Sequence, residues 1–542
     1  MNDLILDIQR ASILFWTALK FALAPTVRYL LHLPARGLAY PVRIRQAMEE
    51  LGLTYLKLGQ FLAMRFDILP VEVCRELNKL FETVSPMMFV EVKTAVESEL
   101  GGRLQDFFPT FNHDPLAAAS VAQVHEAWTH ANEHVAVKVQ RPGIIRIFEA
   151  DMRNLRRIAA LADAFGLIGS ISMKEVADEF ANYTRREMDF ITEGLTAERL
   201  RENAIPCEIV PEIYWDLTTS KILTMEFIEG VSLSQISNML DEKGADFVRD
   251  YLPGLDLERS LHNLAFASLH QLFVTGFFHA DPHPGNVLIR EDNKVAFVDF
   301  GIFGSLTDHQ REILASYIEQ LAFGNINESF RYYSKLAIPT DETDALAFKR
   351  EAKVVLTRWY QVSKRPDASI QERHLATSSG EMLKVLRRYR LRMSMDTLLF
   401  WRALIALDSS ALRLSAHFDL LGELRDFFEQ TRPGPVARVL ELNTDQNRWV
   451  SLAKLGGTSP DRSSRILNDV ASGRYEWPWA VQESAQRRHA KNTEARSISL
   501  AVVGISLTVL AASLHFDPRS RILIIALALF FQMFLITEMR RR

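Results

Sequence analysis

The pattern of hydrophobic and polar positions divides the chain into helical and strand-rich regions. Residues 40–105 follow the amphipathic repeat of helices, whereas 120–128 and 134–140 alternate like two paired strands. Helical periodicity returns over 151–200 and dominates again after Leu255. A strand-rich lobe followed by a helical lobe predicts an α+β fold with two lobes.

Apolar runs lie near both ends of the chain. Residues 13–24 are too few to span a bilayer and follow no basic leader, so we expect a buried or interfacial helix there. Residues 498–514 and 522–537 contain no charged side chain. Together they predict a transmembrane hairpin over 498–537, with a buried soluble hairpin as the alternative. Basic residues on both outer flanks place both of its ends in the cytoplasm.

Composition narrows the possible classes of protein only slightly. A chain of 542 residues is too long for one compact core and predicts two or three structural units. Its net charge of −4 gives no reason to expect nucleic acid as a partner. Only two cysteines occur, Cys74 and Cys207, which argues against a disulfide framework or a zinc site and favours a reducing compartment.

The strongest chemical signal is a pair of short motifs after residue 278. Asp281 precedes Asn286 by five positions, and Asp299 opens an Asp-Phe-Gly at the end of a short apolar strand. This order and spacing are typical of the kinase catalytic loop and its metal-binding motif. We therefore predict that the chain binds ATP and Mg²⁺, with Asn286 and Asp299 as metal ligands and Asp281 facing the nucleophile. An Asp-Phe-Gly alone would indicate no more than a turn.

The strand at 135–140 supplies a second part of a nucleotide site. Alternation places Lys138 on the face opposite three valines, where its ammonium reaches the α- and β-phosphates and the small Ala136 leaves room for adenine. An edge-strand lysine that faces water is the alternative. Glu226 and Phe227, at the end of another predicted strand, would form the interlobe hinge that meets the adenine edge.

Three further motifs lie upstream of the catalytic loop. They are Lys57-Leu58-Gly59-Gln60, the alanine-rich Ala117-Ala118-Ala119-Ser120, and Glu187-Met188-Asp189 followed by Glu193. These motifs resemble the KxGQ element, the alanine-rich loop and the ExD element of the UbiB family, the atypical kinase-like proteins of ubiquinone (coenzyme Q) biosynthesis. The resemblance extends from about Leu51 to Gly304, and the apolar C-terminal hairpin is similar to that of bacterial members.

The resemblance implies a role for each motif in a bilobal protein-kinase-like fold. The alanine-rich loop would replace the glycine-rich loop over ATP, and Glu193 would pair with Lys138. Lys57 and Gln60 would be regulatory, and the lysine would find its partner in the Glu187-x-Asp189 element. This N-terminal extension would cover the usual substrate site.

Helix geometry supports part of this interpretation. Lys57 and Gln60 are three apart and share a face of an otherwise apolar predicted helix, 54–64, so the lysine requires a carboxylate partner. A lysine that snorkels at the helix edge is the alternative. Asp189 and Glu193 are four apart and would share a helical face, whereas Glu187 would turn toward Lys57. Each of these acids, taken alone, would ordinarily be a surface residue.

The alanine-rich loop and the catalytic loop depart from protein kinases. Alanine carries a Cβ, so residues 117–120 should hold another shape than a glycine loop, unless the alanines begin a helix. Ala280 replaces the catalytic-loop arginine, and no Ala-Pro-Glu follows Gly301, where a helix over 305–324 is expected instead. Both departures argue against a peptide substrate and leave nucleotide binding untouched.

The predicted organisation has four parts. They are a helical extension (1–105), an N-lobe with the alanine-rich loop (106–230), a helical C-lobe with the catalytic loop (231–490), and the membrane anchor (498–537). The resemblance implies an ATP-dependent accessory protein of ubiquinone biosynthesis at the bacterial inner membrane, with its kinase-like domain in the cytoplasm. Its partners would be membrane lipids or quinone precursors and other proteins of the pathway. A phosphotransferase on a small or lipid substrate and a catalytically silent pseudokinase scaffold are the alternatives, and a protein kinase comes last.

Overall fold

The computed structural model describes most of the chain up to residue 431. The described residues are 2–23, 39–65, 69–77, 79–80, 85–164, 172–336, 343–365, 369–389, 391 and 393–431. The chain divides into two compact units, the first formed by Met1–Leu155 and Ala177–Phe428, the second by Arg156–Val176 and Glu429–Arg542. The predicted anchor at 498–537 and the end of the predicted C-lobe lie outside the described residues. Among the described helices, none has both the length and the apolar character needed to cross a bilayer.

The N-terminal region is helical, as its periodicity predicts. Its helices are α1 (Asn2–Ala18), the π-helical η1 (Leu19–Leu23), α3 (Tyr40–Leu51), α4 (Leu53–Met64), α5 (Val71–Leu77), α6 (Phe89–Leu100) and α7 (Leu104–Phe107). Gly52 separates α3 from α4 with a φ of 89°, which glycine adopts without strain. The predicted helix 54–64 is therefore α4, whose Ala63 packs with Val73 and Leu77 of α5.

Helix α1 exposes one apolar face. Leu4, Ile8 and Trp16 lie on it and are each more than half exposed. Asp7 of the same helix is buried and accepts hydrogen bonds from Arg153. The expected helix over 13–24 is confirmed as far as residue 23, as the end of α1 followed by η1, but α1 already begins at Asn2.

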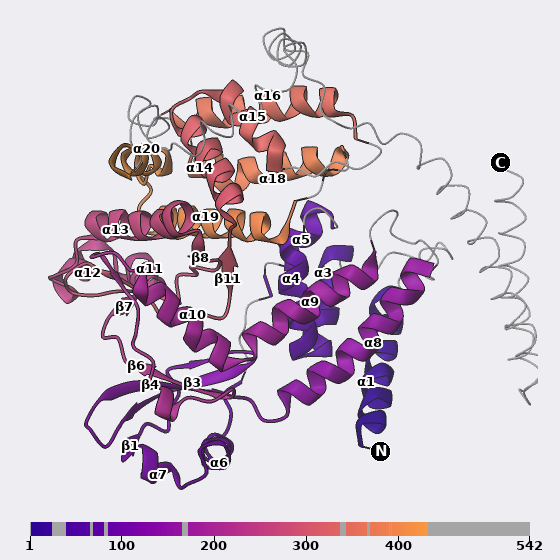
Figure 1. Cartoon of the computed structure of the whole chain (residues 1–542), viewed down its shortest axis with the longest axis vertical. Helices are drawn as coiled ribbons and strands as arrows, with labels where there is room; N and C mark the ends of the chain where they lie inside the picture. The colour runs from indigo at the N-terminus through magenta and orange to yellow at the C-terminus, as the bar shows by residue number, and fades with distance from the viewer. Residues whose placement is uncertain are drawn as a thin grey trace, which may run out of the picture. The chain divides into compact units, whose positions relative to one another are not determined.

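An antiparallel sheet follows (Figure 1). Its strands are β1 (Thr110–Phe111), β2 (Ala117–Ala118), β3 (Ala122–Trp128), β4 (His134–Gln140) and β6 (Ile222–Glu226), in the order β1-β3-β4-β6 with β2 paired to β3. Val135, Val137 and Val139 are fully buried in a cluster that includes Val92 and Val96 of α6. The predicted alternation on β4 is thus confirmed, and it leaves Lys138 on the opposite face.

Helices connect β4 to β6 and carry the acidic motif. They are α8 (Ile144–Ala164), α9 (Met173–Glu187), α10 (Phe190–Glu202) and the 3₁₀ turn η2 (Trp215–Leu217). The chain breaks between α9 and α10, where Asp189 caps α10 by accepting from the Ile191 amide at 3.2 Å. The prediction that Asp189 and Glu193 share a face of one helix is therefore wrong, because Asp189 lies at the helix cap and not within it. In the second unit, Asp163 accepts from the Met173 amide at 2.6 Å.

The rest of the first unit is mostly helical. Its helices are α11 (Leu233–Lys243), α12 (Ala245–Tyr251), α13 (Leu257–His270), the π-helical η3 (Gln271–Thr275), α14 (Asp308–Ala322), α15 (Ile326–Leu336), α16 (Ala345–Ser363), α17 (Ile370–Arg373), α18 (Leu375–Arg388), α19 (Met395–Leu414) and α20 (Leu420–Thr431), whose last residues belong to the second unit. The predicted helix at 305–324 is α14, which begins later because Thr307 caps it and Ser305 ends a strand. Helices α13 and α19 lie side by side (Figure 1) and bury Phe400 against Phe273 and Phe278.

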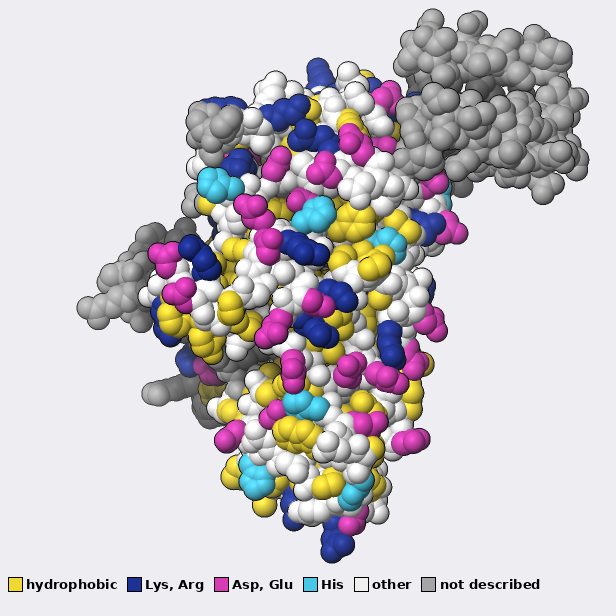
Figure 2. Space-filling view, turned by 90° about the vertical axis from the view of Figure 1, so that its left-hand side faces the viewer, with side chains coloured by type: hydrophobic (Ala, Val, Ile, Leu, Met, Phe, Trp, Pro, Cys, Tyr) yellow, Lys and Arg dark blue, Asp and Glu magenta, His cyan; other side chains and the backbone are white. Residues whose placement is uncertain are grey.

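Short strands interrupt these helices and carry the catalytic motifs. They are β5 (Glu208–Ile209), β7 (Val231–Ser232), β8 (Phe277–His279), β9 (Val287–Ile289), β10 (Val295–Phe297) and β11 (Phe303–Ser305). One sheet has the order β5-β10-β9-β7, and β8 pairs with β11. Phe278 is fully buried, and Gly304 must lack a side chain because a Cβ there would lie 2.1 Å from the Phe278 ring. Acidic and basic side chains are interspersed over the face shown in Figure 2.

Candidate active site

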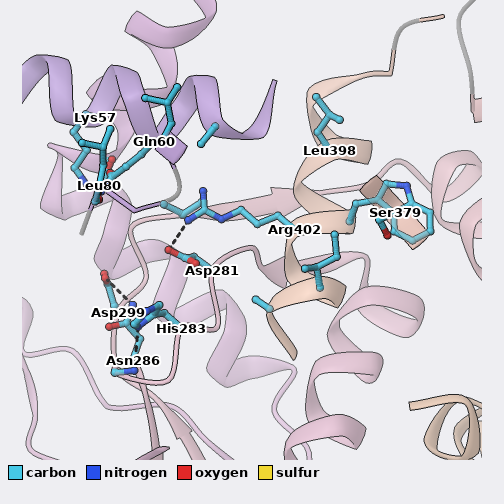
Figure 3. Close-up of a pocket in the computed structure, with 18 of the residues that line it drawn as sticks. Lys57, Gln60, Leu80, Asp281, His283, Asn286, Asp299, Ser379, Leu398 and Arg402 are labelled. Carbon is cyan, nitrogen blue, oxygen red and sulfur yellow. Dashed lines mark hydrogen bonds and ion pairs between the residues drawn. The ribbon is translucent and has the colours of Figure 1, made fainter. Parts of the chain in front are cut away.

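A hairpin brings the two predicted metal ligands together. Asn286 comes directly before β9 and Asp299 shortly after β10, and these strands pair antiparallel with Phe297 opposite Val287. The Val298 amide also donates to the Asn286 carbonyl at 3.1 Å. As a result Asn286 Nδ2 donates to Asp299 Oδ2 at 3.3 Å (Figure 3). Oxygen-bearing side chains from two loops therefore meet at one point, as the sequence motifs predict.

The strand lysine forms the centre of a buried ionic cluster. Lys138 Nζ lies 2.6 Å from Glu193 Oε1 and 3.2 Å from Asp299 Oδ1. Glu193 Oε1 also accepts from the Phe300 amide at 3.3 Å, which ties α10 to the Asp-Phe-Gly segment. The ion pair between Lys138 and Glu193 is thus present, and the alternative of an edge lysine facing water is wrong.

The cluster shifts the pKa values of its members. Burial lowers the pKa of Lys138, but Asp299 and Glu193 outweigh it, so the pKa of the ammonium lies above its ordinary value. Burial raises the pKa of Glu193 to about 7, because Lys138 offsets only part of the desolvation and of the repulsion from Asp299. Burial also disfavours ionised Asp299, yet the positive Lys138 holds its pKa well below the usual range. Asp299 is therefore ionised at neutral pH, as a metal ligand must be.

The residues present fit a magnesium ion bound together with a nucleotide. In the described part of the chain, no three His, Cys, Asp or Glu side chains form a metal site made of protein alone. Mg²⁺ commonly takes one or two protein oxygens and completes its shell with phosphates and water. Asn286 and Asp299 would hold the ion in this way, and it would supply charge neutralisation between the phosphates.

Asp281 lies in the same loop, held by two neighbours. Its amide donates to Nδ1 of the buried His279 at 3.0 Å, and burial lowers the pKa of His279. Its carboxylate forms an ion pair with Arg402 of α19, with Nη2 and Oδ2 2.6 Å apart (Figure 3). The sequence motifs did not indicate Arg402. No local signal marks it, because α19 lies far along the chain and reaches the loop only through the fold.

The KxGQ element contacts the ExD element directly. Lys57 of α4 forms an ion pair with Glu187 at the end of α9, and both side chains are nearly buried. A Cβ on Gly301 would lie 3.3 Å from Glu187 Cγ, so this pair abuts the Asp-Phe-Gly segment. Gln60 Nε2 donates to the Leu80 carbonyl at 3.1 Å and so tightens the helical extension. The predicted partner of Lys57 is therefore Glu187, and the snorkelling alternative is wrong.

The alanine-rich loop is a strand edge. Ala117 and Ala118 form β2, and the Ala119 amide donates to the Ala122 carbonyl at 2.8 Å. Arg141 Nε donates to the Ala119 carbonyl at 3.0 Å, which fixes the turn. None of residues 117–120 has a positive φ, so the loop differs from a glycine loop, and the alternative of a helix start is wrong.

One cavity of about 600 Å³ joins most of these residues. Its charged lining consists of Lys57, Lys138, Glu187, Asp281, Asp299 and Arg402, with Gln60, Asn286 and the loop 117–120 beside them. Glu226 and Phe227 lie apart from the lining of this cavity in the described structure. The Phe227 ring stacks on His134 with centroids 4.0 Å apart, and Glu226 accepts from the Glu212 amide. That the backbone groups of Glu226 and Phe227 contact adenine stays a prediction.

The fold and this site define a kinase-like protein with departures from protein kinases. Residues 79–332 match the family model described as the ABC1 atypical kinase-like domain. This part of the chain is therefore similar to the ABC1 atypical kinase-like domain.

The chain is also similar to several individual proteins over different lengths. The chain is 25% identical over 436 residues to an uncharacterized protein in the hydrogenase 1 5′ region of Clostridium pasteurianum, covering 80% of this chain and 79% of that one. It is 37% identical over 273 residues to the chloroplastic protein Activity of bc1 complex kinase 7 of Arabidopsis thaliana, covering 50% of this chain and only 38% of that protein. A Mycobacterium tuberculosis protein solved in complex with erythromycin matches at 22% identity and a TM-score of 0.47, over 71% of this chain and 93% of that one.

Proposed function

We propose that this protein is an atypical kinase-like ATPase that binds Mg-ATP and supports ubiquinone biosynthesis at a membrane. One observation carries the first part. Lys138, Glu193, Asn286 and Asp299 meet within hydrogen-bond distance, and Asp281 lines the same cavity. A silent scaffold need not retain this full set of charged and polar partners, so their presence favours catalysis over a pseudokinase.

The chain's own residues would divide the work in a simple way. Lys138, already held by Glu193, would position the phosphates of the nucleotide. Asn286 and Asp299 would hold the metal ion, and Asp281 would orient the attacking hydroxyl or water. Arg402 holds Oδ2 of the Asp281 carboxylate, so the guanidinium would fix the orientation of this carboxylate while Oδ1 faces the nucleophile.

The position of the helical extension favours a small acceptor over a peptide. Lys57 of α4 reaches Glu187 beside Gly301, so the extension lies where the catalytic loop would otherwise be open. Among described residues, α14 begins at Asp308, soon after Gly301, which leaves no long activation segment before it.

The ubiquinone assignment and the membrane location rest on resemblance. The three upstream motifs resemble those of the UbiB family, and a relative is named for the activity of the bc1 complex. We therefore extend the proposal to membrane lipids or quinone precursors as ligands and to other proteins of that pathway as partners. The apolar segment 498–537 would anchor the protein in a bacterial inner membrane, with the kinase-like domain in the cytoplasm.

A phosphotransferase acting on a small or lipid substrate is the second candidate. Asp281 favours it, because a carboxylate at this position of the cavity can face a substrate hydroxyl as well as water.

One experiment separates these functions. Purified full-length protein in lipid nanodiscs is incubated with Mg-ATP labelled at the γ-phosphate, and both free phosphate and labelled lipid are measured. Phosphate release without labelled product, lost in Asp281→Asn, supports the ATPase. A labelled lipid establishes the phosphotransferase. Binding of Mg-ATP with neither product would refute both and leave the scaffold.

A further inference from the structure

The cavity continues past Arg402 into a second, apolar part. Leu356 and Trp359 of α16, Met382 of α18 and Leu398 of α19 line it, and each is no more than 6% exposed. In Figure 3, Leu398 lies on the far side of Arg402 from Asp281. We call this part the apolar chamber. The cavity as a whole, at about 600 Å³, is in the size range of small-molecule sites.

Two buried hydroxyl groups line the chamber without a partner. Tyr333 of α15 is 1% exposed and Ser379 of α18 is 9% exposed. Neither hydroxyl oxygen has a hydrogen-bond partner among the described residues. An unpaired buried hydroxyl destabilises a fold, because it loses water and gains nothing in return. Burial also raises the pKa of Tyr333, so its hydroxyl stays neutral and can donate over the whole physiological range.

We propose that the apolar chamber binds a small uncharged molecule, mostly hydrocarbon, whose hydroxyl or carbonyl oxygen pairs with Tyr333 and Ser379. The apolar walls would bury the hydrocarbon part, and the two hydroxyls would recognise the oxygen. Arg402 lies one helical turn after Leu398 on α19, and its guanidinium is already paired with Asp281, so it does not require a charged ligand in the chamber.

Water is the competing occupant. A buried water needs two to four polar partners, and the two hydroxyls supply the minimum, whereas Leu356, Trp359, Met382 and Leu398 offer almost nothing more. A few waters would therefore leave most of the chamber unfilled. The proposal goes beyond the nucleotide chemistry and does not depend on it, because the chamber lies outside the Lys138–Asp299 cluster.

Straight-chain alcohols test the proposal without any nucleotide. Full-length protein in nanodiscs is titrated by calorimetry with butan-1-ol, hexan-1-ol and octan-1-ol, with empty nanodiscs as the blank. We expect one site per chain and an affinity that rises about fourfold for each added methylene group. Leu398→Trp fills the chamber and should abolish the site. Leu346→Trp is the matched control, because Leu346 is 75% exposed on α16.

The hydroxyl pair gives a second, independent readout. For the wild type, the ratio of the affinities for octan-1-ol and 1-chlorooctane should exceed the ratio of their partition coefficients from water into octane. The double variant Tyr333→Phe/Ser379→Ala should lower this preference about tenfold, as two lost hydrogen bonds would. If Leu398→Trp fails to fold, this ratio decides alone. Absence of a saturable site, or an unchanged ratio in the double variant, would overturn the proposal, and both outcomes are independent of ATP hydrolysis.

Discussion

The cavity has a charged part, lined by Lys138, Asp281, Asn286 and Asp299, which we call the nucleotide half, and the apolar chamber. The two parts differ in whether their polar groups already have partners when no ligand is bound. In the nucleotide half, Lys138 pairs with both Glu193 and Asp299, at no more than 3.2 Å. In the chamber, the hydroxyls of Tyr333 and Ser379 have no partner in the described structure. A buried charge requires a partner even when no ligand is bound, because its desolvation cost is large. The cost of leaving a neutral hydroxyl unpaired is smaller, so a fold tolerates it. The charged half is therefore preorganised, and the apolar half depends on its ligand.

Asp299→Asn should have the largest effect on nucleotide binding, because it removes a charged metal ligand from the preorganised half. Wild type at a Mg-ATP concentration one hundred times its Kd should gain about 2.7 kcal/mol of stability, seen as a thermal shift, and the variant should gain none. Asp292→Asn is the control, since Asp292 lies in the β9–β10 turn and pairs only with nearby Arg290 and Lys294 in the described structure. An undiminished shift in Asp299→Asn would contradict the assignment of the metal site.

Lys57→Met tests whether the ion pair between Lys57 and Glu187, at the edge of the nucleotide half, is required for stability. It removes the ammonium group that pairs with the nearly buried Glu187, which should cost about 3 kcal/mol of unfolding free energy. The double variant Lys57→Met/Glu187→Met removes both charges and should recover most of this loss in urea unfolding. Lys79→Met, on an exposed pair with Glu76, should change stability little. If the single and double variants lose the same unfolding free energy, Lys57 does not stabilise the fold through its ion pair with Glu187.

The charged half could be predicted from the sequence, because its chemistry is encoded locally. The Asp281-to-Asn286 spacing and the strand lysine Lys138 are short-range patterns, and the fold brings them together through the β9–β10 hairpin and the sheet. The helix break at Asp189 has no such local mark, because the chain between α9 and α10 contains no Gly or Pro. The role of Arg402 is not encoded locally either, since it depends on where α19 packs.

The apolar chamber could not be predicted from the sequence. Leu356, Met382 and Leu398 read as ordinary core positions of amphipathic helices, and the same pattern describes a filled core and a lined cavity. Whether helices close over a space depends on their packing angles and side-chain shapes, which no local pattern records. The sequence does not show that the hydroxyl of Ser379 is buried without a partner, because this depends on which residues surround it.

The pH dependence of stability should distinguish the two halves further. The folded pKa of Glu193, at about 7, lies above its unfolded value. Its contribution to stability is therefore full below the unfolded pKa and is lost as pH rises through about 7. Between pH 5 and pH 8, the wild type should lose on the order of 2 kcal/mol of unfolding free energy through this group. Glu193→Gln should not show this loss when thermal unfolding of the nucleotide-free protein is followed across the same range.

Two comparisons make this pH test specific. Burial also raises the pKa of Glu208 to about 7, so Glu208→Gln should remove a separate part of the same slope. Tyr333→Phe should leave the slope unchanged, because burial moves the pKa of that hydroxyl well above this range. An unaltered slope in Glu193→Gln would mean that Lys138 keeps Glu193 ionised throughout, and the cluster would then be a plain ion pair.

The smallest expected effect concerns the rim of the nucleotide half, at Ala119. The Ala119 amide and carbonyl are both engaged, with Ala122 and with Arg141, and no residue of 117–120 has a positive φ. A kinase glycine loop uses positive φ to turn amides toward the phosphates, and a Cβ makes that conformation cost roughly 1 kcal/mol or more. Ala119→Gly removes the Cβ and with it the cost of a positive φ at this position. It leaves every charged side chain of the site in place.

The loop should then close further over the nucleotide. We expect ATP or ADP affinity to change a few-fold, consistent with about 1 kcal/mol, and autophosphorylation to rise because transfer is less restrained. The measurements are ATP and ADP affinity and labelling of the protein by ATP, for wild type and variant side by side. Ala131→Gly is the matched control, since Ala131 is an exposed alanine in the β3–β4 turn outside this loop. If Ala119→Gly behaves like Ala131→Gly in all three measurements, the alanine-rich loop is a structural edge of the sheet and does not tune nucleotide use.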